Sequence, residues 1–326
     1  MKKMRITVCL LVLLSFFAFN GCGKVGSDEK AVLKWETTEE GTTFTYGEKT
    51  QRFYQITELP FPTFWGGEAY SIITPNNELY LIDGGFQGED GERIATYIEE
   101  HGGKVKGWFL THPHVDHIGA FLDYMKNHSE NVENVYFSPF TKEFFEEEQD
   151  PEIYKIINNA ILYYEFLEIQ EKTNDKVNYV PLLVGDELML EELKLECFAS
   201  FDKNRKDVNG NSLVFTLSYN DFTMLLTGDM TELTLSDMEK QFQPDEAVWN
   251  VDILQIPHHG YMAGIASDAL YQSTNPKAAL LDCTVEEYTN NSVMIQDHVT
   301  MIEELGIPVL KRFESSEGNK IFLYVH

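Results

Sequence analysis

The segment 111–119 reads Thr-His-Pro-His-Val-Asp-His-Ile-Gly and places three histidines and one aspartate close together. Imidazole nitrogens and carboxylate oxygens are the ligands that zinc and similar divalent metals prefer. His112 and His114 lie two positions apart, so both could reach one metal. Asp116 and His117 are adjacent and point in different directions, so they could serve a second metal. The run predicts two metals in one pocket, with a bridging water as the nucleophile.

Apolar segments on both sides of this run would hold the ligands in place. Residues 106–111 read as a short buried strand, and residues 118–125 read as the beginning of a helix. A strand-to-helix turn on a rigid scaffold can fix metal ligands.

Three further apolar runs are closed by glycine beside an acid or a histidine. They cover residues 79–85, 223–229 and 251–260. Each is typical of a strand rich in aliphatic residues. Just past the strand ends lie Asp83, Asp229, His258 and His259. If these strands lie side by side, their ends converge on one edge of the sheet and gather ligands distant in sequence.

The series of motifs resembles the metallo-β-lactamase fold superfamily. In chain order it consists of Asp83, the run 112–117, Asp229 and His258-His259-Gly260. The resemblance covers residues 52–326. It implies an α/β (α+β) fold, an αββα sandwich of two β-sheets packed face to face with helices outside. The binuclear site would lie at one edge of a single domain, which we expect to be a monomer.

One branch of the superfamily matches better than the antibiotic-hydrolysing enzymes. The run 208–215, Val-Asn-Gly-Asn-Ser-Leu-Val-Phe, precedes the Gly-Asp motif, and Pro257-His-His-Gly follows it. This order resembles the hydrolase domain of the ComEC/Rec2 competence proteins. It is also similar to the phosphorylcholine esterases that act on teichoic acid. The resemblance implies phosphoester hydrolysis.

The chain departs from the wider family in one respect. Most members have a further metal-binding histidine before the Gly-Asp motif, whereas here no histidine lies between His128 and His258. Asn211 and Ser212 occupy that region and become candidates for substrate contact, together with Tyr261. A metal with fewer nitrogen ligands has a more open site, which allows manganese as well as zinc.

The resemblance and the ligand chemistry suggest a role for each residue. His112 and His114 would hold the first metal. Asp116, His117 and His259 would hold the second, and Asp229 would bridge both. His258 would either contact a metal ligand without binding the metal itself or donate a proton to the leaving oxygen. The expected catalytic residues are therefore Asp116, Asp229 and His258. Asp83 would orient a ligand histidine by accepting its other N–H.

The start of the chain predicts where the protein resides. A basic segment, residues 1–5, precedes an apolar run over residues 6–19, which is shorter than a membrane-spanning helix needs. This pattern fits a secretory signal peptide over residues 1–21, followed by a lipidated Cys22. Polar residues 22–51 would form a flexible tether. We therefore expect a bacterial lipoprotein anchored on the extracytoplasmic face of the cell membrane.

Composition limits the substrate and the redox state. The chain has 25 basic and 53 acidic residues, a formal net charge of −28. Nucleic-acid binding normally uses a basic surface, so a nucleic-acid substrate is not expected. Cys197 and Cys283 could pair in an exported protein or remain as buried free thiols. Aromatic residues in the predicted helix 151–172 could form a choline cage, although packing on the sandwich is the favoured interpretation.

These observations predict an extracytoplasmic, membrane-tethered, binuclear metal hydrolase that cleaves phosphodiester bonds in a small molecule or cell-wall polymer. Two divalent metals are required, with zinc favoured and manganese allowed. One alternative keeps the fold and changes the substrate to a lactone, a carboxylic ester or a β-lactam. Another is a non-catalytic, cell-surface binding lipoprotein, which would have no need of a complete ligand set.

Overall fold

The computed structural model describes residues 32–60, 67–147, 159–290 and 294–325. Within them, the first sheet has nine strands in the order β1-β2-β16-β3-β4-β5-β6-β7-β8. Their bounds are β1 Lys34–Thr37, β2 Thr42–Tyr46, β3 Phe53–Glu58, β4 Ala69–Ile73, β5 Leu79–Asp83, β6 Val105–Leu110, β7 Val132–Phe137, β8 Asn178–Pro181 and β16 Lys320–Tyr324. Strands β5 to β8 run parallel.

The second sheet has seven strands among the described residues, in the order β15-β14-β13-β12-β11-β10-β9. Their bounds are β9 Glu187–Leu190, β10 Leu193–Ala199, β11 Val214–Tyr219, β12 Phe222–Leu226, β13 Ile253–Gln255, β14 Ala278–Leu281 and β15 Val309–Lys311. Strands β12 to β15 run parallel. Each sheet thus has one parallel half, whose strands need helical crossovers.

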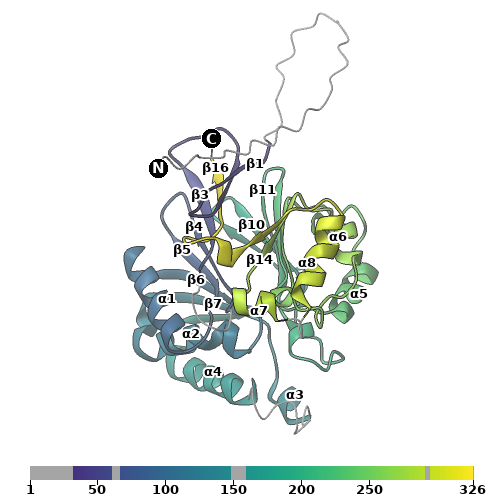
Figure 1. Cartoon of the computed structure of the whole chain (residues 1–326). Helices are drawn as coiled ribbons and strands as arrows, with labels where there is room; N and C mark the ends of the chain where they lie inside the picture. Colours follow the sequence, from purple (N-terminus) through teal and green to yellow (C-terminus); the bar gives the residue numbers. More distant parts are fainter. Residues whose placement is uncertain (1–31, 61–66, 148–158, 291–293, 326) are drawn as a thin grey trace, which may run out of the picture. The chain divides into compact units, whose positions relative to one another are not determined.

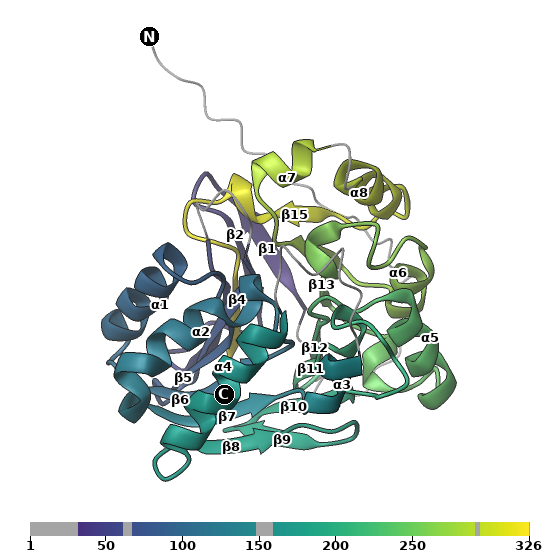
Figure 2. The same ribbon diagram turned by 90° about the horizontal axis from the view of Figure 1, so that it is seen from below.

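Helices supply these crossovers and cover the outer faces of both sheets. Their bounds are α1 Glu89–Glu100, α2 Val115–His128, α3 Lys142–Glu147, α4 Asn159–Thr173, α5 Glu232–Gln241, α6 Ala269–Thr274, α7 Val285–Thr289 and α8 Ile295–Glu304. Helices α1, α2 and α4 pack on the first sheet, and α5, α6 and α8 lie beside the second (Figures 1 and 2). The αββα sandwich predicted from the sequence is confirmed.

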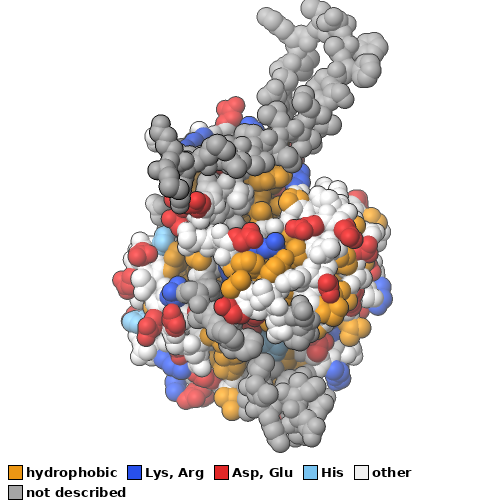
Figure 3. Space-filling model, in the orientation of Figure 1, with side chains coloured by type: hydrophobic (Ala, Val, Ile, Leu, Met, Phe, Trp, Pro, Cys, Tyr) orange, Lys and Arg blue, Asp and Glu red, His pale blue; other side chains and the backbone are white. Residues whose placement is uncertain are grey.

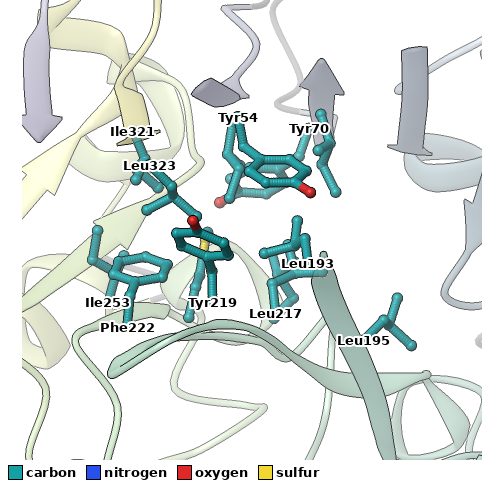
Figure 4. Close-up of a cluster of buried hydrophobic side chains, with 14 of the residues drawn as sticks. Tyr54, Tyr70, Leu193, Leu195, Leu217, Tyr219, Phe222, Ile253, Ile321 and Leu323 are labelled. Carbon is teal, nitrogen blue, oxygen red and sulfur yellow. The ribbon is translucent and has the colours of Figure 1, made fainter. Parts of the chain in front are cut away.

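Apolar side chains fill the space between the two sheets. Strand β5 is buried at all its positions because helices cover one face and the other sheet covers the opposite face. Tyr54 and Tyr70 of the first sheet approach Leu193, Leu217 and Tyr219 of the second (Figure 4). The ring centroids of Tyr54 and Tyr219 are 5.6 Å apart. This packing holds the strand ends of both sheets in fixed positions.

The domain begins earlier than residue 52. Strands β1 and β2 form a hairpin inside the predicted tether, and β2 pairs in parallel with β16. Phe44 and Tyr46 are buried in the core because Thr and aromatic residues alternate along β2. The predicted tether over residues 22–51 is therefore too long, since its second half belongs to the sandwich.

Three further expectations concern the start of helix α2, the two cysteines and the aromatic residues of α4. Helix α2 begins at Val115, three residues before the predicted start, so Asp116 and His117 lie in its first turn. Cys197 and Cys283 are buried free thiols, so of the two alternatives the structure has the unpaired one. In α4, Phe166 packs into the helix-covered core, as the packing interpretation predicted.

The predicted signal peptide and Cys22 lie outside the described residues. Among the residues that the structure describes, no helix is both long enough and apolar enough to cross a membrane.

Candidate metal centre

The predicted ligands meet where strands of both sheets end. β5 ends in Asp83, and the run 112–117 follows β6 and opens α2. From the second sheet, Asp229 follows β12, and the pair His258-His259 follows β13. Because these strands are parallel within each sheet, their carboxyl ends share one edge. The sandwich therefore gathers ligands from four separate segments, as the sequence predicted.

Asp229 lies at the middle of this cluster, and its two carboxylate oxygens face different histidines. Oδ1 is 3.3 Å from His117 Nε2 and 3.7 Å from His259 Nε2. Oδ2 is 3.5 Å from His112 Nε2 and 3.7 Å from His258 Nε2. Asp116 Oδ2 lies 3.3 Å from His259 Nε2. His112, His117 and Asp229 form one group that could hold a metal, and Asp116, His117 and His259 form a second, with His117 common to both. Asp229 thus contacts histidines of both groups, the arrangement expected of a bridging ligand.

The atoms that face the centre have no hydrogen-bond partner among the described residues. They are His112 Nε2, His117 Nε2, His259 Nε2 and Asp229 Oδ1, all buried. Buried polar atoms are almost always satisfied, so several unsatisfied ones aimed at one another need an explanation. A divalent cation would satisfy all of them. The donor set of imidazole and carboxylate fits zinc or manganese.

A second layer of groups holds three of the imidazoles by their other nitrogen. Asp83 Oδ2 is 2.7 Å from His117 Nδ1, and the same carboxylate accepts the backbone N–H and hydroxyl of Thr111. His112 Nδ1 lies 3.2 Å from Ser212 Oγ, and His259 Nδ1 lies 3.2 Å from the carbonyl of Asp282. Such partners fix the ring orientation and leave Nε2 free for a metal.

The turn after β13 has an unusual backbone. His258 and His259 both have left-handed φ angles, 54° and 53°, and Gly260 follows at 83°. A non-glycine residue in this region costs on the order of 1–3 kcal/mol, so the surroundings must hold the turn. His298 of α8 contributes, because its Nδ1 lies 2.8 Å from the carbonyl of Gly260 while its Nε2 lies 2.8 Å from the Tyr271 hydroxyl. Strain of this kind is typical of functional sites.

A buried glutamine holds the turn that carries Asp229. Gln255 Oε1 accepts hydrogen bonds from the backbone N–H groups of Thr227, at 2.7 Å, and Gly228, at 2.9 Å. Its Nε2 donates to Glu68 Oε2 at 2.6 Å. Gln255 and Glu68 are fully buried. The strand β13 thereby positions a ligand that belongs to the neighbouring strand β12.

Charges within the cluster shift the pKa of each group. Burial lowers the pKa of His117 and of His259, but the surrounding carboxylates, Asp229 foremost, together outweigh burial and raise both well above the ordinary value. Burial raises the pKa of Asp116, yet the charge of His117 and the hydrogen bond with His259 bring it to about 2. Without metal, protons on the two imidazoles offset the carboxylates. Metal binding should therefore release protons.

The other imidazoles favour the neutral form. Burial lowers the pKa of His112 well below its ordinary value, and the neighbouring His117 adds to the effect. Burial lowers the pKa of His114 to about 4. It also lowers the pKa of His258, which makes this side chain a poor proton donor near neutral pH. A neutral imidazole is the form that binds metal.

Four predicted residues occupy less central positions: His114, Asn211, Ser212 and Tyr261. His114 lies beside His112, with ring centroids 4.5 Å apart. The amide of Asn211 is used within its own loop, accepting from the N–H of Asp202 and donating to the carbonyls of Arg205 and Asp207. This use removes the basis for the predicted substrate contact of Asn211.

Ser212 and Tyr261 also differ in their surroundings. Ser212 is fully buried, and its hydroxyl lies against His112 and accepts the backbone N–H of Asp229. It therefore supports two ligands instead of facing a substrate. Tyr261 is partly exposed, and its ring centroid lies 5.2 Å from that of His258. Tyr261 thus remains a candidate for substrate contact.

Sequence reasoning missed Glu68, Gln255 and Asp282. Asp282 had a signal, because it follows the apolar strand β14 as Asp83 follows β5. Gln255 lies inside an apolar strand, where a polar residue could have been noticed. Glu68 acts through contacts between segments far apart in the chain, and no local pattern marks it.

Comparison with known proteins agrees with this geometry. A sequence profile described as "Metallo-beta-lactamase superfamily" matches residues 63–278. RNase aCSPSF2 of Saccharolobus solfataricus is 25% identical over 156 residues, which cover 46% of this chain and 28% of the relative. The chain thus spans less than a third of that relative's length.

Solved structures show the same fold at low sequence identity. The metallo-beta-lactamase fold protein YhfI from Bacillus subtilis has a TM-score of 0.50 and 13% identity, with 83% of this chain and 99% of that chain covered. A variant of the CmlA beta-hydroxylase has a TM-score of 0.50 and 10% identity, with 82% and 53% covered. Because the profile covers more than half of the chain and the sandwich gathers the ligands at one edge, the chain belongs to the metallo-beta-lactamase superfamily of metal-dependent hydrolases.

Proposed function

We propose that this hydrolase cleaves phosphodiester bonds. The observation that carries the proposal is the position of Asp229, whose two oxygens face different histidines. Such a site suits two metals a short distance apart. Two bound divalent metals would supply positive charge for the phosphoryl oxygens and an activated water.

The protein's own residues keep this site rigid. Asp83 holds His117 in one orientation, and Gln255 holds the turn that carries Asp229. Both hydrogen-bond networks are buried, so the ligands are already in place before a substrate arrives. The partly exposed Tyr261 lies beside His258 and its hydroxyl donates to Glu287 at 2.7 Å, so its ring is the part that we propose for substrate contact.

Two independent similarities favour a phosphodiester over a lactone, a carboxylic ester or a β-lactam. The order of motifs resembles the ComEC/Rec2 branch and the phosphorylcholine esterases. The curated relative is named as an RNase, and RNA is linked by phosphodiester bonds. The second similarity makes RNA a candidate substrate in its own right.

Surface charge disfavours a long nucleic acid. The chain has a net charge of −28. On the face in Figure 3, Lys and Arg side chains are scattered among more numerous acids. Repulsion by such a surface weakens the binding of a polyanion. We therefore propose a small molecule or a cell-wall phosphoester as the substrate.

Turnover assays test the proposal directly. The full chain in detergent is stripped of metal and reloaded with zinc or manganese. It is then assayed on bis-p-nitrophenyl phosphate, p-nitrophenyl phosphorylcholine, single-stranded RNA, a lactone and a chromogenic β-lactam. Metal-dependent cleavage of the phosphodiesters that disappears in Asp229→Ala supports the proposal. Cleavage of RNA alone would replace the proposed substrate class.

The opposite pattern would reject the proposal. If the loaded protein hydrolyses the lactone or the β-lactam and neither phosphodiester, the reaction class is wrong. If it binds two metals and cleaves none of these compounds, the non-catalytic binding alternative gains support.

We also propose that the hydrolase is a lipoprotein on the extracytoplasmic face of the membrane. The basic start, the short apolar run and Cys22 support this proposal. Expression in a bacterium with labelled fatty acid provides the test. Label should follow the wild-type chain into the membrane fraction and be absent from Cys22→Ala. Equal labelling of both would overturn the proposal.

A further inference from the structure

The consecutive histidines His258 and His259 approach opposite sides of the Asp229 carboxylate. His259 Nε2 lies 3.7 Å from Oδ1, on the side of His117 and Asp116. His258 Nε2 lies 3.7 Å from Oδ2, on the side of His112.

We infer that His258 is a ligand of the first metal, so that the pair His258-His259 contributes one ligand to each metal. The inference rests on the proposed metal centre but not on its substrate. It changes the role of His258 from an outer group or proton donor to a ligand of the first metal, beside His112 and Asp229.

The backbone explains how two adjacent residues can do this. In a strand, neighbouring side chains point to opposite faces and could not both reach one carboxylate. Here both histidines take left-handed φ angles, and their ring centroids are 6.3 Å apart on either side of Asp229. The strained backbone of this turn therefore orients both imidazole rings toward Asp229.

Gly264 leaves the space that the His258 ring needs. A Cβ atom at residue 264 would lie 2.9 Å from His258 Cβ and 3.2 Å from its Nδ1. No real side chain would tolerate such a contact without movement. The fold therefore keeps His258 against the ligand cluster, where its side chain is only 16% exposed.

A different role for His258 must be separated from this one. Asn209 Nδ2 lies 3.2 Å from His258 Nε2, so His258 could simply anchor the short 3₁₀ turn η2 (Asn209–Asn211). With the amide donating, Nε2 is an acceptor and the proton is on Nδ1, which has no hydrogen-bond partner among the described residues. The same tautomer binds metal through Nε2, whose single lone pair would then exchange the Asn209 hydrogen bond for the metal. A variant of Asn209 can therefore distinguish a ligand from an anchor.

The inference also bears on which metal the site prefers. Without His258, the first metal has fewer nitrogen ligands, which leaves room for manganese. A further imidazole nitrogen moves the preference toward zinc. Replacing His258 with an oxygen donor should move it back toward manganese.

Metal binding to the full chain, measured without any substrate, tests the inference. Wild type, His258→Ala, His259→Ala and Asn209→Ala are loaded with zinc and titrated with a chelator. We expect His258→Ala and His259→Ala each to lose one metal at chelator concentrations that the wild type resists. The loss in affinity should exceed the roughly 10–100-fold that removal of an outer hydrogen-bond partner costs. Asn209→Ala should stay close to wild type.

Two results would overturn the inference. One is a His258→Ala protein that keeps both metals with wild-type affinity. The other is an Asn209→Ala protein that loses metal as readily as His258→Ala, which would mean that His258 acts through the η2 turn. Since a variant could fail to fold, cobalt-loaded wild type provides a second measurement. Its NMR spectrum should contain a paramagnetically shifted N–H signal from His258 Nδ1, and an unshifted signal would refute the assignment.

The remaining comparison separates this inference from the proposed function. His258→Asp should retain both metals, and its affinity for manganese relative to zinc should be higher than in wild type. An unchanged ratio of the two affinities would count against the ligand role. Failure of phosphodiester cleavage by wild type with two metals bound would reject the substrate class and leave the role of His258 intact.

Discussion

Replacing Gln255 with methionine should destabilise the protein severely, although Gln255 contacts no predicted metal ligand directly. Methionine has a similar size and no hydrogen-bonding amide. The change leaves the backbone N–H groups of Thr227 and Gly228 buried without their acceptor. It also removes the donor to Glu68 Oε2.

The expected loss follows from these contacts. Each buried N–H left without an acceptor costs about 1–3 kcal/mol, and two are affected. Loss of the bond to Glu68 adds to this cost. We therefore expect the free energy of unfolding to fall by roughly 3–6 kcal/mol. For a domain whose total stability is typically about 5–15 kcal/mol, this is a large share.

Urea unfolding of the chelator-treated protein, followed by tryptophan fluorescence, measures the effect. Metal is removed first because a ligand that binds only the folded state would mask the change. The matched control is Gln55→Met on β3, where the half-buried glutamine has one side-chain hydrogen bond, to Thr57. The control should stay within about 0.5 kcal/mol of wild type. A loss below about 1 kcal/mol in Gln255→Met would refute the reasoning.

Three further predictions concern other parts of the molecule. Asp83→Asn should reduce kcat/KM and metal affinity by about 10–100-fold, because His117 loses the carboxylate that orients it. The circular dichroism spectrum should be unchanged. Wild-type metal affinity in this variant would contradict the role of Asp83. Burial raises the pKa of Glu58 from its ordinary value of 4.5 to about 8. Between these two pH values the folded protein keeps a proton on Glu58 that the unfolded chain has released. The free energy of unfolding should therefore fall as the pH rises from about 4.5 to about 8. Glu58→Gln should remove that pH dependence. In urea unfolding, the stability of the variant relative to wild type should therefore increase from pH 5 to pH 9. If the difference in stability between variant and wild type is the same at both pH values, Glu58 is not protonated in the folded protein. Burial raises the pKa of Cys197 to about 12 and that of Cys283 further, so neither thiol should react with a thiol reagent until the protein unfolds; rapid labelling of the native chain would contradict the burial.

The four ligand-bearing turns could be predicted because each is a local pattern. An apolar strand that stops at a glycine beside an acid or a histidine can be recognised within about ten residues, and Asp83 and Asp229 were found in this way. The long-range pairing of the sheets was not visible in the sequence. It entered through the resemblance, which supplied the order of the motifs and the sandwich.

The residues that support the ligands could not be found in the same way. Gln255 acts on the turn of the neighbouring strand, and Glu68 reaches it from the other sheet. These contacts depend on how β4 and β13 pack, which no window of sequence contains. The left-handed pair His258-His259 is a second case, because histidine has no intrinsic preference for that conformation and tertiary contacts must impose it.

The hairpin β1–β2 was misread for a physical reason. Its residues are mostly Thr, Glu and Gly, and β1 is exposed along its whole length. Composition of this kind is typical of a tether. The alternation in β2, which buries Phe44 and Tyr46, was the contrary signal. An edge hairpin buries one face of one strand, so most of its sequence looks like a linker.

The position of β16 has a consequence for the order in which the protein can fold. β16 lies between β2 and β3, so the last strand of the described chain separates two of the earliest. A growing chain could pair β3 with β4 and complete the second sheet, but β1–β2 would have no partner strand until residues 320–324 emerged. Until then, Phe44 and Tyr46 would be exposed, a state prone to aggregation. The protein is therefore expected to complete its sheet only after synthesis of the whole domain, with a slow final step set by this long-range pairing.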